Sequence, residues 1–109
     1  MADERSRELL TAVELSAGLS QLHDDWTGSP DALTRSIEFA DFATAVEFVN
    51  ELAPACEERD HHPDLALRWR WVDIVLSTHS AGGVTRMDIG LAQVVDEIAA
   101  QLPQAGDEA

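Results

Sequence analysis

The segment that decides the fold runs from His61 to His79 and reads HHPDLALRWRWVDIVLSTH. Its apolar residues alternate first on odd positions and then on even positions: Leu65, Leu67 and Trp69, followed by Val72, Ile74 and Leu76. One continuous strand would send these two sets to opposite faces of a sheet. A tight turn at 69–71 restores a single apolar face, so the pattern predicts two antiparallel strands at about 64–69 and 72–79.

A long amphipathic helix precedes these strands. Apolar residues recur at steps of three and four along one predicted face: Phe42, Val46, Val49, Ala53 and Cys56. This spacing predicts a helix over about 41–59. Pro63 ends it, because a proline pushes the residue before it out of the helical region. Pro54 predicts a kink inside the helix or the start of a second helical turn at 54, and Cys56 on the apolar face predicts a buried, unreactive thiol.

The last predicted helix follows the second strand after a glycine-containing loop. Thr85 and Asp88 are spaced as in a capping box, in which a hydroxyl and a carboxylate each accept a backbone hydrogen bond at the helix start. Apolar residues then continue at helical spacing: Leu91, Val94, Val95, Ile98 and Leu102. The helix is expected to end at Pro103, since proline cannot continue it.

The first forty residues predict a helix and a hairpin. A capping-box pattern at 11–14 starts a helix that we expect over about 12–22. A Gly-Ser-Pro-Asp turn then separates two strands, predicted at about 24–28 and 32–39. Trp26 lies in the first of these strands, where a core position is expected in preference to ligand binding.

Together these elements predict an α+β fold in one domain, in the order α-ββ-α-ββ-α. We expect a four-stranded antiparallel sheet with three helices on one face. The domain is expected to span residues 11–103, between a flexible N-terminal segment at 1–10 and a flexible tail at 104–109.

Composition excludes several classes of protein. The net charge is −14, from 7 basic and 21 acidic residues, which argues against binding to nucleic acid or to an anionic membrane surface. A single cysteine excludes an intramolecular disulfide. The N-terminus is polar, without the apolar run of a signal peptide, and no segment approaches the ~18 apolar residues of a membrane helix. We therefore expect a cytoplasmic protein.

Three of the four histidines fall in the fold-deciding segment. Histidine gives or takes a proton near neutrality, because its ordinary pKa is roughly 6.5. His61 and His62 precede Pro63 at a helix end, and His79 lies at a strand end. Asp88 follows at a helix start. Catalytic groups concentrate at such element ends and loops, so the sequence predicts one site here.

Each of these residues also has a simpler interpretation. Imidazole and carboxylate suit zinc or iron, but no His-x-x-x-His pair is present, so we expect no metal. Asp88 could act as a helix cap alone. Trp69 could be a core aromatic or the wall on which a flat ring stacks. Glu57 is expected on the helix surface, and His23 lies outside the pattern at an exposed position.

The arrangement of these residues resembles the pterin-4a-carbinolamine dehydratase family. The likeness rests on the spacing of five features: Glu57, the His-His-Pro triplet, Trp69, the Thr-His pair at 78–79 and Asp88. The segments at 39–48 and 88–92 resemble the same family. In all, the likeness extends over about 11–102, nearly the whole chain.

The resemblance implies a dehydratase that converts 4a-hydroxytetrahydropterin to quinonoid dihydropterin and water, with a pterin as its small-molecule substrate and no cofactor. It implies His61 and His79 as the acid and base, in an order that the sequence leaves open. The residues expected to bind or orient substrate are His62, Pro63, Trp69 and Asp88. It also implies a homodimer or homotetramer. The alternative function is a non-catalytic protein-binding module, either a dimerisation cofactor for transcription factors or an assembly helper for a large carboxylase.

Overall fold

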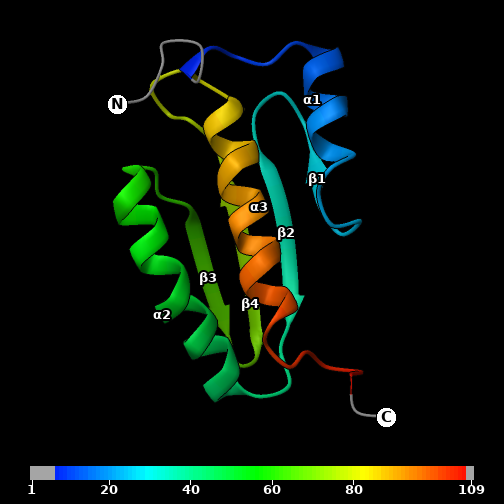
Figure 1. The fold of residues 1–109 in the computed structure, drawn as a ribbon, viewed down its shortest axis with the longest axis vertical. Helices are drawn as coiled ribbons and strands as arrows, with labels where there is room; N and C mark the ends of the chain where they lie inside the picture. The colour runs from blue at the N-terminus through cyan, green and yellow to red at the C-terminus, as the bar shows by residue number, and fades with distance from the viewer. Residues whose placement is uncertain (1–6, 108–109) are drawn as a thin grey trace.

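The computed structural model describes residues 7–107, which form seven helices and strands (Figure 1). Their bounds in chain order are α1 (Ala12–Leu19), β1 (Thr27–Gly28), β2 (Leu33–Glu38), α2 (Phe42–Arg59), β3 (Asp64–Arg68), β4 (Trp71–Leu76) and α3 (Arg86–Ala100). The predicted α+β order of helix, two strands, helix, two strands and helix is confirmed.

The sheet has the strand order β1-β2-β4-β3, and every neighbouring pair is antiparallel. In the β3–β4 hairpin, Leu65 pairs with Ile74 and Leu67 with Val72. The odd and even apolar sets therefore share one face, as the predicted turn requires. Trp69 makes this two-residue turn possible by adopting a left-handed conformation, with φ of 55°.

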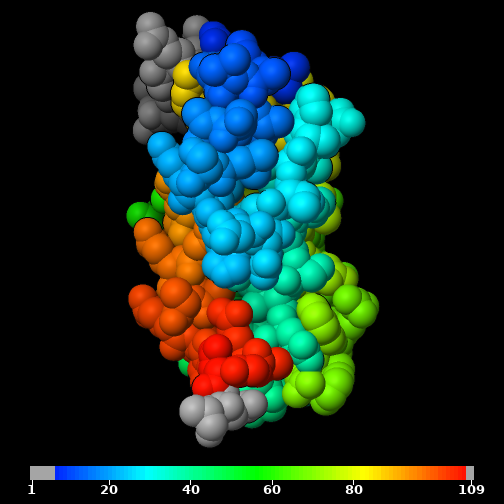
Figure 2. All heavy atoms as spheres, turned by 90° about the vertical axis from the view of Figure 1, so that its right-hand side faces the viewer, coloured from blue at the N-terminus to red at the C-terminus, as the bar shows by residue number. Residues whose placement is uncertain are grey.

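Helices cover only one face of this sheet. Along β2 and β4 every second side chain is buried, and the buried set packs under α2 and α3. The other face is polar: Ser36 donates a hydrogen bond to Asp73, and Arg68 forms an ion pair with the same carboxylate. In the side view, α3 and the yellow-green β3–β4 hairpin lie on opposite sides of the molecule (Figure 2).

The apolar face predicted for α2 is displaced by one position. The buried residues of this helix are Ala45, Phe48, Leu52 and Cys56, whereas Phe42 and Ala53 are exposed. Two rows one residue apart share the same spacing of three and four, so spacing alone did not select between them. The ring of Phe48 packs at 5.0 Å from that of Phe39, which fixes the choice. The helix continues through Pro54 to Arg59.

The first helix and the first strand are shorter than predicted. The capping box of α1 is present, but the chain leaves the helix at Leu19 and forms tighter turns, in which Leu22 N–H donates to the Leu19 carbonyl. A further turn at 23–26 leaves only Thr27–Gly28 in strand β1. Trp26 is buried, so its predicted core position is confirmed.

A carboxylate on α3 holds this N-terminal hairpin against the helix. Asp96 Oδ1 accepts hydrogen bonds from Trp26 Nε1 at 2.7 Å and from an Arg35 guanidinium nitrogen at 2.6 Å. Asp96 Oδ2 accepts the backbone N–H of His23 at 2.8 Å. Arg35 is buried, although it is an arginine, because its charge is paired here.

Both ends of the described chain are hydrogen-bonded to the domain. Leu10 N–H donates to the Val84 carbonyl, and Ala105 N–H donates to the Glu38 carbonyl. The predicted flexible segments lie partly outside the described residues, at 1–6 and 108–109, and the domain limits stay a prediction. None of the described helices is long and apolar enough to cross a membrane.

Candidate active site

The end of α2 places two adjacent histidines in different surroundings. Asp60 follows the helix in a left-handed conformation with φ of 49°. His61 N–H still donates to the Cys56 carbonyl, at 3.1 Å. Pro63 then directs the chain into β3. This sharp change of direction buries His61, of which 8% is exposed, and leaves His62 at the surface.

His61 is held by a fully buried carboxylate. Its Nε2 lies 2.6 Å from Asp88 Oδ1. Asp88 Oδ2 accepts the backbone N–H of Thr85 at 2.9 Å and the hydroxyl of Thr78 at 2.8 Å. Asp88 is therefore a helix cap and a histidine partner at once, and the two interpretations of this residue are compatible.

His79 reaches the same region from a tight loop after β4. The strand ends at Leu76, three residues earlier than predicted, because Thr78 pairs with Gly83 across the loop. His79 itself is exposed. Gly83 lies so close to the β1–β2 turn that a Cβ atom there would come within 2.4 Å of the Pro30 carbonyl oxygen. Glycine is thus required for the loop to pack in this position.

A cavity of about 330 Å³ brings the histidines of the two loops together. Its lining includes His61, His62 and His79, with Thr78 and Met87 beside them. The predicted gathering of the three histidines is thus present, and Asp88 lies directly behind His61. In the part of the chain that the structure describes, no group of three or more His, Cys, Asp or Glu side chains is arranged to hold a metal ion.

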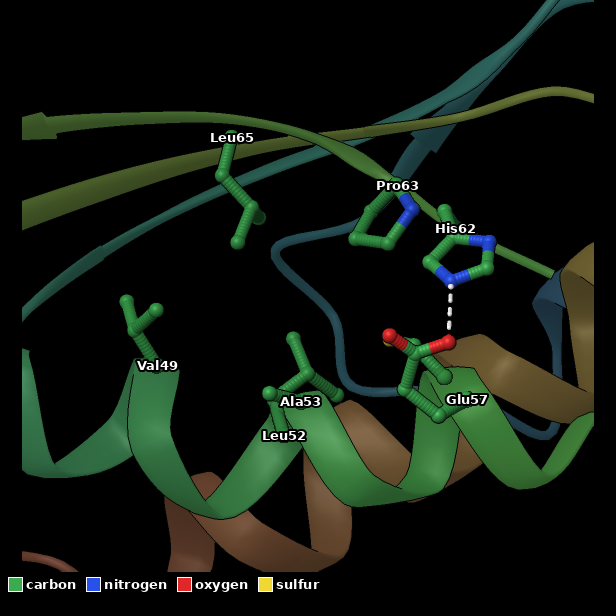
Figure 3. A pocket seen from close by; sticks show the side chains of 8 residues that line it. Val49, Leu52, Ala53, Glu57, His62, Pro63 and Leu65 are labelled. Carbon is green, nitrogen blue, oxygen red and sulfur yellow. Dashed lines mark hydrogen bonds and ion pairs between the residues drawn. The ribbon is translucent and has the colours of Figure 1, made fainter. Parts of the chain in front are cut away.

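A second, apolar groove of about 200 Å³ adjoins this cavity. It lies between α2 and β3, where Val49, Ala53 and Leu65 face one another above Leu52 (Figure 3). His62 borders both spaces, and its Nε2 contacts Glu57 Oε2 at 3.2 Å. Both of these side chains are more than half exposed.

Pro63 and Cys56 also line the groove. Pro63 closes its end beside His62, in addition to turning the chain out of α2 (Figure 3). Cys56 is buried as predicted, and burial raises the pKa of its thiol, which keeps it protonated.

Trp69 lies outside the cavity. It occupies the turn at the other end of β3 from His62 and is 64% exposed, with the Arg70 guanidinium 4.4 Å from the centre of its ring. The interpretation of Trp69 as a core aromatic is therefore wrong. The alternation failed here because Trp69 belongs to the turn after β3, where its left-handed backbone, with φ of 55°, takes it out of the strand.

Two features of the site were not assigned from the sequence. Thr78 was noted beside His79, but the pairing of its hydroxyl with Asp88 depends on the packing of β4 against α3. Asp60 was not noted at all, because the left-handed residue that ends a helix is usually glycine and only occasionally aspartate. A polar residue just before the histidines was the only local signal for it.

Comparison with known proteins identifies one family and several relatives of this chain. A family model of pterin 4 alpha carbinolamine dehydratase matches residues 8–98. A Bradyrhizobium protein named as a pterin-4-alpha-carbinolamine dehydratase is 50% identical over 103 residues, covering 94% of this chain and 99% of its own. A Nocardia farcinica protein of the same name is 45% identical over 92 residues, covering 84% and 96%.

Two solved structures share the fold. The crystal structure of a transcriptional coactivator/pterin dehydratase from Brucella melitensis has a TM-score of 0.78 and 40% identity, and the match covers 83% of this chain and 97% of that one. A pterin dehydratase-like protein identified as a RuBisCO assembly factor in the alpha-carboxysome has a TM-score of 0.57 and 27% identity, covering 68% and 86%.

Proposed function

Because this chain belongs to the pterin 4 alpha carbinolamine dehydratase family, we propose that it dehydrates 4a-hydroxytetrahydropterins to quinonoid dihydropterins. The observation that carries the proposal is the cavity in which three imidazoles meet, one of them fixed by a buried carboxylate. The substrate is proposed to be a free pterin, which is small enough to enter a cavity of this size.

The reaction needs one proton donor and one proton acceptor. The hydroxyl group leaves C4a and is protonated to water, while the proton on N5 is removed and a double bond forms between the two atoms. The atoms balance, with no oxidant or reductant required. Positioned side chains of neutral-range pKa typically contribute ~10²–10⁴ in rate to each such transfer, and histidines meet this requirement.

The contact with Asp88 favours His61 as the base. A carboxylate only accepts hydrogen bonds, so the proton of neutral His61 lies on Nε2 and points at Asp88. The lone pair is then on Nδ1, the ring nitrogen left for substrate. His79 is exposed at the other side of the cavity, and we assign it the protonation of the leaving hydroxyl. His62 would orient the pterin ring.

An assay of 4a-hydroxytetrahydropterin decay by stopped-flow ultraviolet absorbance tests the function. We expect the wild type to accelerate decay, and His61→Ala and His79→Ala each to lose at least about 100-fold of that acceleration. His23→Ala is the control, since His23 is exposed and lies outside the cavity. A folded wild type that leaves the decay rate unchanged would sink the proposal.

We further propose a homo-oligomer, a dimer or a tetramer, formed through β3. Among the described residues this strand is an edge of the sheet, with no strand beside its outer N–H and C=O groups. Such edges invite pairing with another chain. Leu65 and Leu67 expose about 40% of their area beside the apolar groove (37% and 42%). A second copy would cover both, and a contact of Trp69 with substrate would have to come from such a neighbouring chain.

Light scattering of Leu67→Glu against the wild type tests this interface. The variant is expected to be monomeric, because a charge would be buried on pairing. Val13→Glu is the control, since Val13 is 79% exposed on α1, away from β3. A wild type that is itself monomeric would remove the interface proposal and leave the dehydratase proposal intact.

The second candidate function is a protein-binding module. It is favoured by the two structural neighbours, one named a coactivator and the other a RuBisCO assembly factor. Isolation of a stoichiometric partner that His61→Ala and His79→Ala bind as well as the wild type does, with no dehydratase activity in any of the three, would favour it.

A further inference from the structure

Thr78 lies between the two proposed acid and base histidines and contacts the machinery of both. Its side chain is buried beside Asp88, the partner of His61. Its backbone starts the loop that carries His79. No other residue among those described both touches the partner of His61 and adjoins His79.

The direction of each hydrogen bond around Thr78 follows from counting protons. The Thr78 hydroxyl donates its one proton to Asp88 Oδ2, at 2.8 Å. The 2.7 Å contact between the hydroxyls of Thr78 and Thr85 must then have Thr85 as its donor. Together with the Thr85 N–H, two donors occupy Oδ2, and Oδ1 is left for His61. The carboxylate is thereby fixed in one orientation.

The backbone of Thr78 fixes the second histidine. Its carbonyl accepts the N–H groups of Ala81 and Gly82, both at 2.9 Å, and its own N–H donates to the Gly83 carbonyl at 2.9 Å. These bonds close the 78–83 loop on itself, directly around His79. A displacement of Thr78 would consequently move both the partner of His61 and the loop that presents His79.

We infer that Thr78 is a positioning residue that sets the two histidines relative to each other through its hydroxyl bond to Asp88. This inference deepens the proposed function, and its test by kcat and KM rests on that function. The hydroxyl holds Asp88 so that His61 keeps its proton on Nε2 and its lone pair toward the cavity. Thr78 itself takes no proton from the substrate.

Thr78→Val tests the inference, because valine keeps the shape of threonine and removes the donor. We expect kcat to fall roughly 10- to 100-fold, the size of one lost hydrogen bond to a charged group, with KM changed less than about threefold. Thr78→Ser, which keeps the hydroxyl, should recover most of kcat. If Thr78→Val does not fold, Thr78→Ala replaces it, with thermal unfolding as the check on folding.

Thr34→Val is the matched control. Thr34 shares a 2.6 Å hydroxyl–hydroxyl bond with Thr27 on the same sheet, but on an exposed surface. It should keep kcat and KM at wild-type values. Wild-type kcat in Thr78→Val, or a loss in Thr78→Ser as large as in Thr78→Val, would overturn the inference, since the second result would show that restoring the hydroxyl does not restore the rate.

Nitrogen-15 NMR of the histidine rings provides a readout that needs no substrate. In the wild type, neutral His61 should carry its proton on Nε2. In Thr78→Val, Asp88 loses the bond that fixes its orientation, so part of neutral His61 should move its proton to Nδ1, while Thr34→Val keeps the wild-type tautomer. An unchanged tautomer in Thr78→Val would overturn the inference even if the wild type proves to be no dehydratase.

Discussion

Two carboxylates on α3, eight residues apart, have the same kind of environment and different consequences. Asp88 accepts bonds from His61, from the Thr78 hydroxyl and from a backbone N–H. Asp96 accepts bonds from Arg35, from the Trp26 indole and from a backbone N–H. Each carboxylate therefore accepts three bonds and joins α3 to a distant segment.

The two carboxylates differ in the chemistry of their hydrogen-bond partners. A guanidinium does not lose its charge in proteins and an indole N–H only donates, so neither of these two partners of Asp96 can exchange a proton with a substrate at working pH. An imidazole changes charge near neutrality, and His61 borders the cavity. A carboxylate that accepts three hydrogen bonds is thus no sign of chemistry by itself. Asp88 differs from Asp96 in having a titratable partner that borders a cavity.

The largest effect should come from Asp88→Asn. The amide oxygen can still accept the Thr85 N–H, so the protein should fold, but an amide cannot stabilise an imidazolium as a carboxylate does. We expect kcat/KM for dehydration to fall at least about 100-fold. Asp96→Asn should retain most of the activity in its folded fraction. Equal losses in the two variants would erase the distinction between the sites.

Asp96→Ala should have the largest effect on stability. It leaves the Arg35 charge buried and unpaired, with 2% of that side chain exposed. Breaking a buried pair in this way typically costs 3–5 kcal/mol, and since 20% of the Asp96 side chain is exposed we expect about 3 kcal/mol. Urea unfolding measures it. A loss below about 1 kcal/mol would show that solvent replaces the carboxylate.

Trp26→Phe tests the Asp96 cluster by changing one of its donors instead of the carboxylate. It removes the indole donor and leaves a smaller ring at a buried position, so the free energy of unfolding should fall by about 1 kcal/mol for the lost bond and further for the cavity, with no change in dehydration rate. The same urea titration and the decay assay test both halves. A decrease in rate would indicate that the Asp96 cluster also influences the cavity.

Surface carboxylates should show the smallest effect, visible only in acid. Hydrogen bonds from Thr44, first from its side chain and then from its backbone N–H, lower the pKa of Asp41 below its ordinary 3.8, and the bond from Arg68 lowers that of Asp73. A lowered folded pKa means that the stabilisation is complete above about pH 5 and is lost as the pH falls through the lowered values, below about pH 4.

Acid unfolding followed by circular dichroism measures this contribution. Asp41→Asn should reduce the slope of stability against pH below about pH 4 and leave stability near pH 7 little changed, because asparagine still caps the helix. Glu47→Gln on the exposed face of α2 is the control. A slope unchanged in Asp41→Asn would assign the acid sensitivity elsewhere.

Local patterns sufficed to predict most of the fold. The switch of parity at 69–71 predicted the β3–β4 hairpin, and two capping boxes predicted the starts of α1 and α3. The predicted buried row of α2 was displaced by one position. Apolar residues lie on two neighbouring rows of this helix, and only the contact of Phe48 with Phe39 shows which row is buried.

The site was predictable only where the chain itself carried chemical signals. His61, His62 and His79 were identified because imidazoles stood at the ends of elements, and they do line one cavity. Asp96 was not identified, because an acid inside a helix looks like a solvated surface residue until Arg35 is brought to it from β2. The hydroxyl of Thr78 was left without a role for the same reason: its partner lies ten residues on, across a loop.

The close packing of Gly83 against the Pro30 carbonyl has a consequence for how such chains can diverge. The hydrogen bond from Val84 N–H to the Pro30 carbonyl, at 2.9 Å, ties the β1–β2 turn to the loop that carries His79. Insertions usually accumulate in surface turns. Here a residue added to the first turn would push the second loop outward, so the lengths of these two distant segments should be inherited together.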